Sequence, residues 1–356
     1  YFARPLSELG LADCALLAAI VNSPGRFNPF TASERALERR NLVLSKMLAN
    51  EMIDQEQMNQ AAQSPLPKPV KRTLNDPAPY FIQAAFRYLD KKGVSREEHE
   101  GLRIFTTLDP FAQNLAQRQV IKEIDRLESE NKKVKAIKEE KKKNLEMTLI
   151  SVDLESGGIT ALVGGRQYLK TQYNRVLDAN RQVGSVMKPF VYLAALESRT
   201  PEGEPYTATT IIEDIPFRHR YEGQTWSPRN YTREHFGPVP MFYALKNSLN
   251  ISTAKLALSV GLSNVIDVAE RAGITSEMKP FPSLSLGAFE IKQWELAQAF
   301  STIARFGEYR EIHTVDRVED LTGEEIYQFQ PTTEQRLNPT ATAELIGMMK
   351  QNLITG

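Results

Sequence analysis

The 356-residue chain is predicted to be an α+β protein with a mostly helical N-terminal segment, a linker region and a second domain that opens with β-strands. Three observations lead to this prediction. Residues 1–64 carry apolar side chains at helical spacing. Residues 64–79 contain five prolines, which disfavour regular secondary structure. Residues 149–163 contain two short apolar runs around a glycine turn, and mostly helical stretches follow them, an order typical of α+β domains.

Helix-start and helix-stop signals locate the first elements. Asp54 is followed three residues later by Gln57, a capping box that satisfies two free backbone N–H groups and predicts a short helix. Tyr80 to Lys92 has helical spacing, and Gly93 after it is a typical helix end. The lone cysteine, Cys14, lies in an apolar run and is predicted to be buried.

The central part of the chain combines strands and helices. Ile104–Leu108 is predicted to be a strand, and Asp109-Pro110 is a typical start for the long helix after it. The apolar face of that helix is predicted from side chains at helical spacing: Phe111, Leu115, Ile124 and Leu127. Leu149–Val152 and Ile159–Val163 are predicted to form a hairpin. Further helices are expected after Ser185, over Met241–Val260 and around Trp294–Phe306.

Composition excludes several functional classes. Formal net charge is zero and the sequence pI is about 7.1, so overall charge does not favour nucleic-acid binding. The lysine-rich tract at 132–143 is interrupted by glutamates and is predicted to be a solvated helix face. The four histidines are scattered without metal-ligand spacing, so no metal or cofactor is expected, and all four are interpreted as structural or surface residues. The longest apolar run, Cys14–Val21, is too short to cross a bilayer.

The tetrapeptide Ser185-Val186-Met187-Lys188 is the first candidate for chemistry. Residues three apart share a helix face, so Ser185 Oγ and Lys188 Nζ are expected to lie close together. A lysine acts as a base only when burial or nearby positive charge lowers its pKa, and the apolar neighbours of Lys188 favour burial. Pro189 is tolerated only near a helix start, which predicts Ser185 on a first turn whose free N–H groups stabilise an oxyanion.

Ser248-Leu249-Asn250 is the second candidate. Each motif alone is weak evidence, because a chain with 44 Lys and Arg residues contains such spacings by chance. The alternative for the second motif is a helix with two satisfied polar residues. The order of the two motifs and the sequence around them favour the functional interpretation.

Further segments agree with these two motifs in order and spacing. They are Gly158–Gly165, Tyr173–Arg175, Arg181–Phe190, Trp226–Tyr231, Ala244–Asn250, Leu284–Gly287 with Glu295–Phe300, and, near the N-terminus, Tyr1–Leu9 and Ser23–Pro29. Together they resemble the class A penicillin-binding proteins, the bifunctional peptidoglycan synthases, over nearly the whole chain and least closely at about 120–146. The resemblance implies a penicillin-binding/β-lactamase-like transpeptidase fold with an antiparallel sheet.

The resemblance also implies a domain organisation. Residues 1–64 would be the C-terminal part of a lysozyme-like peptidoglycan glycosyltransferase domain, 65–146 an interdomain region, and 147–356 a transpeptidase domain. The family's glycosyltransferase glutamates would precede Tyr1, and its Lys-Thr-Gly strand would follow Gly356, which would leave the sheet incomplete. The chain is therefore expected to be part of a longer protein, located on the extracytoplasmic side of the membrane and anchored by an N-terminal transmembrane helix.

The implied reaction is D,D-transpeptidation through a serine acyl-enzyme, with Ser185 as nucleophile, Lys188 as base, Ser248 as proton relay and Asn250 as a substrate-binding amide. The implied partners are stem peptides, lipid-linked precursors and β-lactams, with other cell-wall synthesis proteins left open and nucleic acid excluded. Two alternatives remain at this point. One is a carboxypeptidase or β-lactamase of the same superfamily, and the other is a catalytically inert piece that acts as a binding module.

Overall fold

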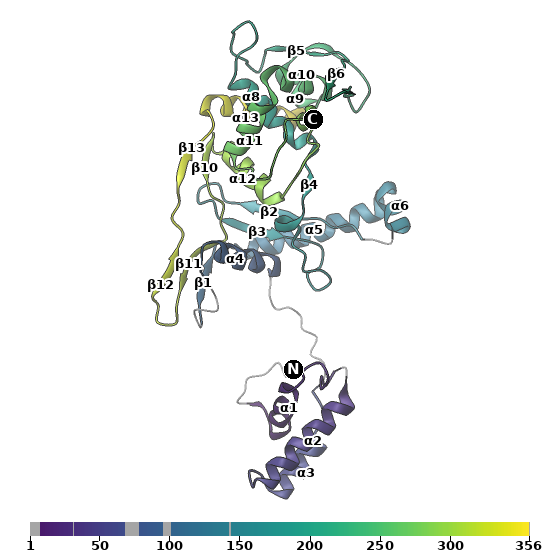
Figure 1. Ribbon diagram of the computed structural model, residues 1–356, viewed down its shortest axis with the longest axis vertical. Helices are drawn as coiled ribbons and strands as arrows, with labels where there is room; N and C mark the ends of the chain where they lie inside the picture. Colours follow the sequence, from purple (N-terminus) through teal and green to yellow (C-terminus); the bar gives the residue numbers. More distant parts are fainter. Residues whose placement is uncertain (1–7, 31, 68–77, 95–100, 142–143, 356) are drawn as a thin grey trace. The chain divides into compact units, whose positions relative to one another are not determined.

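The computed structural model describes residues 8–30, 32–67, 78–94, 101–141 and 144–355 (Figure 1). The chain divides into two compact units, an N-terminal unit of residues 1–75 and a C-terminal unit of residues 76–356. His99, Tyr1–Ser7 and most of the proline-rich stretch, at 68–77, lie outside the described residues. The combination of helices with small antiparallel sheets confirms the predicted α+β class.

The N-terminal unit is helical, as predicted. Its described elements are α1 (Leu11–Val21), α2 (Ser33–Ala49) and α3 (Gln55–Gln63). Asp54 Oδ1 accepts a hydrogen bond from the Gln57 N–H at 2.7 Å, and Gln57 Oε1 accepts one from the Asp54 N–H at 3.0 Å. The predicted capping box is therefore present, and it explains why α3 begins at Gln55.

The prediction that Cys14 is buried is wrong, because its side chain is exposed. The buried positions of α1 are Ala15, Leu16, Ala19 and Ile20. At 3.6 residues per turn these positions form one face, and Cys14 lies on the opposite, solvent-facing side of the helix. An apolar run that is continuous in sequence does not reveal which side of a helix meets the core.

In the C-terminal unit, two helices pack against a β-hairpin. The hairpin consists of β2 (Leu149–Val152) and β3 (Ile159–Val163), which pair antiparallel as predicted. Residues of α4 (Pro79–Lys91) and α5 (Pro110–Glu130) share hydrophobic clusters with β3. A second antiparallel sheet has the strand order β1 (Arg103–Thr106), β11 (Val315–Glu319), β12 (Glu325–Gln328). Figure 1 shows both β-structures below the main group of helices.

Helix α5 begins as predicted, with the Asp109 carboxylate accepting hydrogen bonds from the Phe111 and Ala112 N–H groups. The predicted apolar face is wrong in part, since Phe111 is 74% exposed and Leu115 is 41% exposed. The buried face instead contains Gln113, whose amide bonds both the N–H and the C=O of Leu162 in β3. A strand edge needs hydrogen-bonding partners, and this glutamine supplies them.

The helical part of this unit surrounds α8 (Lys188–Leu196), in which every side chain from Lys188 to Ala195 is buried. Around it lie α9 (Met241–Lys246), α10 (Asn250–Val260), α11 (Leu262–Ala272), α12 (Gln293–Ala304) and α13 (Pro339–Thr355). Phe190 meets Phe300 of α12 edge-on, with ring centroids 5.7 Å apart. Each large apolar side chain buried here contributes about 1.5–3 kcal/mol to stability, which fixes α8 as the centre of the unit.

The remaining elements are short. The helical ones are α6 (Lys132–Lys141), α7 (Arg175–Asp178), and the 3₁₀ turns η2 (Gly184–Met187) and η3 (Pro282–Leu286). Helix α6 has no buried residue among those described, as predicted for a solvated face. The paired strands are β4 (Arg181–Gln182) with β9 (Glu290–Ile291), β5 (Ile211–Asp214) with β8 (Gly237–Pro240), β6 (His219–Tyr221) with β7 (Gln224–Trp226), and β10 (Glu308–Arg310) with β13 (Thr333–Gln335).

Within the described ranges, no single helix is both long and apolar enough to span a bilayer. Helices α10 and α11 reach that length and composition only when taken together, and a 94° bend separates them. The helical stretch predicted over Met241–Val260 consists of two helices, because α9 ends at Lys246 and α10 begins at Asn250.

Two glycines bring distant segments together at the start of α8. The Gly184 N–H donates to the Gly287 carbonyl at 3.2 Å, next to the antiparallel pair of strands β4 and β9. Gly287 has φ +72°, and a Cβ placed there would lie 2.1 Å from the Gly184 oxygen. Only glycine fits, both because of its positive φ and because the two backbones nearly touch.

We expect Gly287→Ala to lower the free energy of unfolding of the C-terminal unit by about 3 kcal/mol or more, since backbone strain and a clash add together. Both tryptophans, Trp226 and Trp294, lie in this unit, so urea unfolding followed by tryptophan fluorescence reports on it. Gly323→Ala is the matched control, because Gly323 has φ +89° but open space at its Cβ. Gly323→Ala should lower the free energy of unfolding by only about 1 kcal/mol. Equal losses for the two variants would contradict the close-contact explanation.

Candidate active site

Ser185 lies in the 3₁₀ turn η2, which continues directly into α8. The side chain of Ser185 is exposed, and Pro189 occupies the first turn of α8, so the predicted position at a helix start is confirmed. Gly184 has φ +55°, and its backbone hydrogen bond to Gly287 supports the turn. The sequence therefore presents an accessible hydroxyl on a rigid support.

Lys188 is one helical turn after Ser185 and is only 1% exposed. Its Nζ donates three hydrogen bonds, to the Ser248 carbonyl at 2.5 Å, to Ser248 Oγ at 2.9 Å and to Asn250 Oδ1 at 2.7 Å. None of these bonds goes to Ser185. The structure thus brings Lys188, Ser248 and Asn250 into direct contact. The fourth predicted site residue, Ser185, lies one turn before Lys188 on the same helical segment.

Burial lowers the pKa of Lys188 to about 8, well below the ordinary lysine value. The cause is loss of hydration, which disfavours the charged ammonium, and the three acceptors around it are all uncharged. A lysine with this pKa is partly neutral near physiological pH and can accept a proton. The geometry and the electrostatics of the site therefore suit Lys188 to general-base chemistry.

Ser248 occupies the break between α9 and α10 and has φ +51°, an uncommon conformation for a residue other than glycine. This conformation directs both its carbonyl and its hydroxyl to Lys188. Backbone strain of this kind costs about 1–3 kcal/mol and persists only where surrounding contacts impose it. The break in the helix is thus part of how the site is built.

Asn230 and Asp214 support Asn250 through a chain of hydrogen bonds. The sequence alone does not identify either of them as a site residue. Asn230 Oδ1 accepts hydrogen bonds from the N–H groups of Asn250, at 2.8 Å, and Ile251, at 3.2 Å, and so caps α10. Asn230 Nδ2 donates to Asp214 Oδ2 at 2.8 Å, and both side chains are buried. Asn230 lies in the Trp226–Tyr231 segment that carries the resemblance, whereas Asp214 has no sequence signal.

The described residues contain no group of three or more His, Cys, Asp or Glu side chains arranged to hold a metal ion. His313 is buried and stacks on Phe329 with ring centroids 3.5 Å apart, and its Nε2 lies 3.1 Å from Asp316 Oδ1. Burial lowers the pKa of His313 and so favours its neutral form. Its position is that of a structural residue.

Two known protein families match parts of this chain. Residues 147–355 match the family described as the penicillin binding protein transpeptidase domain, and residues 1–48 match the transglycosylase family. Penicillin-binding protein 1A from Haemophilus influenzae has a solved structure that superposes with a TM-score of 0.77 at 19% identity, covering 100% of this chain and 69% of that one. At this identity the structural match shows the fold alone.

Curated relatives add sequence identity over the same extent. The chain is 34% identical to penicillin-binding protein 1B of Vibrio cholerae over 360 residues, which covers 100% of this chain and 44% of that protein. It is 33% identical to penicillin-binding protein 1B of Escherichia coli, covering 99% of this chain and 41% of that protein. The chain thus spans less than half the length of these relatives. With both family matches in order along the sequence, it belongs to the class A penicillin-binding proteins.

Proposed function

We propose that this protein cross-links peptidoglycan by D,D-transpeptidation, with Ser185 as the nucleophile. The observation that carries the proposal is the buried amine of Lys188, whose pKa is lowered to about 8 and which Ser248 and Asn250 hold one helical turn from the exposed Ser185. A serine hydroxyl is a weak nucleophile unless a neighbouring base removes its proton, and Lys188 is the base that we propose for this step.

In the proposed reaction, Lys188 Nζ takes the proton from Ser185 Oγ as Oγ attacks the carbonyl carbon of the penultimate D-Ala of a stem peptide. The bond from that carbonyl carbon to the nitrogen of the terminal D-Ala breaks, and Ser248 relays a proton to the departing amine. An amine of a neighbouring stem then attacks the ester, forms the new amide and returns a proton to Ser185. Asn250 binds the substrate backbone and orients Lys188.

β-Lactams are proposed to acylate the same serine, because their strained amide imitates the D-Ala-D-Ala peptide bond. A solved relative from Mycobacterium tuberculosis, penicillin-binding protein A, is described as an imipenem acyl-enzyme complex and supports this proposal by analogy. We also propose that stem peptides and lipid-linked precursors are the natural substrates, and that the site works on the extracytoplasmic side of an anchoring membrane.

The proposed domain organisation is a glycosyltransferase part at 1–64, an interdomain region at 65–146 and a transpeptidase domain at 147–356. The transglycosylase match over residues 1–48 supports the first of these. It also favours a bifunctional synthase over a carboxypeptidase or β-lactamase of the same superfamily. The third candidate, an inert binding module, differs from both in that it forms no acyl-enzyme.

We expect mass spectrometry of the intact protein, expressed from its whole gene and treated with penicillin, to find the adduct on the peptide that contains Ser185. Ser185→Ala should abolish the adduct. Ser198→Ala is the control, since Ser198 lies just after α8 and its hydroxyl only bonds the Ala194 carbonyl. An adduct elsewhere would refute the assignment of the nucleophile, and the absence of any adduct would favour the inert module.

The acylation rate constant is expected to rise with pH and to level off above about 8. The sign follows from the role of Lys188, which is active only when neutral, and its pKa is lowered to about 8. Lys188→Ala should slow acylation by at least about 10²-fold and remove this pH dependence. Ser248→Ala should cost less, because its carbonyl still holds Lys188. Stopped-flow acylation over pH 6–10 measures these effects. A wild-type rate for Lys188→Ala would mean that another group is the base.

Asn230→Ala is expected to slow acylation about tenfold and to move the midpoint of its pH profile. Loss of a helix cap costs about 0.5–2 kcal/mol, and here it also loosens the backbone of Asn250, whose side-chain Oδ1 accepts a hydrogen bond from Lys188. Asn264→Ala is the matched control, because Asn264 Nδ2 bonds the last carbonyl of α10, at Val260, beyond the site. A lower stability with an unchanged pH midpoint in Asn230→Ala would indicate a purely structural role.

A further inference from the structure

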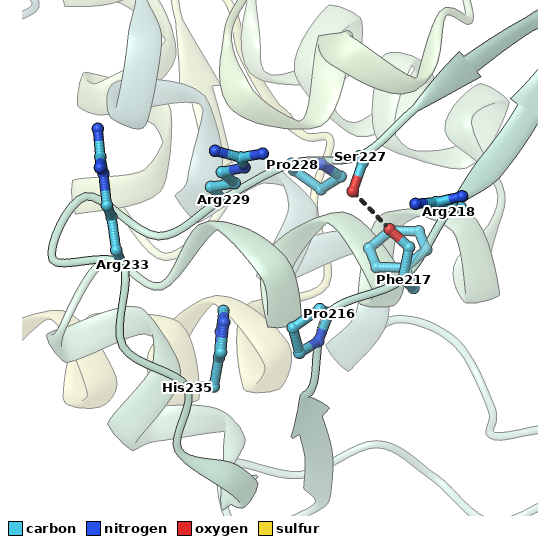
Figure 2. A pocket seen from close by; sticks show the side chains of 8 residues that line it. All are labelled: Pro216, Phe217, Arg218, Ser227, Pro228, Arg229, Arg233 and His235. Atoms are coloured by element: carbon cyan, nitrogen blue, oxygen red, sulfur yellow. Dashed lines mark hydrogen bonds between the residues drawn. The ribbon is translucent and has the colours of Figure 1, made fainter.

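A basic cavity of about 420 Å³ lies beside the candidate active site, in the C-terminal unit. Its lining residues are Pro216, Phe217, Arg218, Ser227, Pro228, Arg229, Arg233 and His235. Figure 2 shows the four basic side chains distributed around this space. Ser227 Oγ donates to the Phe217 carbonyl at 2.9 Å, which ties two of the lining segments together.

The cavity collects positive charge that the protein itself does not neutralise. Its lining includes three arginines and a histidine and no acidic residue. Across the described part of the chain, the ion pairs do not include these arginines; the nearby Glu213, for example, pairs with Lys255. The carboxylate of Asp214 is likewise turned to Asn230 Nδ2 and the Phe236 N–H. Like charges gathered around one cavity create a positive potential that attracts an anionic group.

The wall of this cavity is hydrogen-bonded to the side-chain amide of Asn250. The Arg229 carbonyl accepts a hydrogen bond from Asn250 Nδ2 at 2.9 Å, and the other end of that amide, Oδ1, accepts from Lys188. The next residue, Asn230, caps α10, and the Arg233 N–H donates to the Asn230 carbonyl at 3.1 Å. The wall of the cavity is therefore linked to Lys188 through the single side chain of Asn250.

We infer that this cavity binds free carboxylates on the peptide arm of the substrate, an inference that rests on the proposed function. A guanidinium presents a planar pair of N–H donors that matches a carboxylate, and three of them offer room for more than one acidic group. Peptide is the substrate part that must enter the site, because the bond that breaks is a peptide bond. A phosphate group shares the same anionic chemistry, so the experiment below includes it.

The test measures how peptides protect Ser185 of the intact protein from acylation by a fluorescent penicillin. The probes are a D-Ala-D-Ala peptide with free side-chain carboxylates, the same peptide with those carboxylates amidated, and inorganic pyrophosphate. We expect the free peptide to protect wild type about tenfold better than the amidated one, as a few partly exposed charge-assisted contacts provide. The double variant Arg218→Ala/Arg233→Ala should lose this preference and keep its acylation by penicillin.

Arg220→Ala is the matched control, since Arg220 is exposed on the neighbouring strand β6 and does not line the cavity. It should keep the preference. Equal protection by the two peptides, protection by neither, or arginine-dependent protection by pyrophosphate alone would each overturn the inference. A wild type that is not labelled at Ser185 would instead refute the proposed function, so the two failures are distinguishable.

Discussion

The C-terminal unit depends on one constraint, the burial of a lysine amine at the centre of its helical core. Lys188 begins the most buried helix of the unit, where a charged group is costly unless polar partners surround it. Ser248 and Asn250 provide three acceptors from a single chain segment, and the break between α9 and α10 allows them to do so. The packing of α8 thus requires the same residues, Ser248 and Asn250, to which we assign roles in the proposed reaction.

Those acceptors are in turn held by a second layer of hydrogen bonds. Asp214, at the end of β5, positions Asn230, and Asn230 caps the helix that begins with Asn250. On the other side of the site, Gly287 and the β4–β9 pair support the turn that carries Ser185. Distant segments of the chain therefore support Ser185 and Lys188, the proposed nucleophile and base, from different sides.

Local signals in the sequence predicted much of this. The caps at Asp54 and Asp109, the hairpin at 149–163 and the helix start at Ser185 depend on neighbouring residues, and the structure confirms them. The break at Ser248 was beyond such signals, because distant partners impose its strained backbone. The same holds for Asp214, which contributes through a contact sixteen residues away. On α5, helical spacing indicated an apolar stripe but not which side of the helix meets β3.

The three hydrogen bonds that Lys188 Nζ donates have a consequence for the protonation of this lysine. An ammonium has three hydrogens, and Lys188 donates all three to Ser248 and Asn250. A neutral amine has two hydrogens and a lone pair, so when Lys188 loses its proton one of these contacts either breaks or reverses direction. Only the Ser248 hydroxyl can both accept and donate, by rotating about its C–O bond. Protonation and deprotonation of Lys188 are therefore coupled to rotation of the Ser248 hydroxyl, whose orientation depends on whether the lysine is charged.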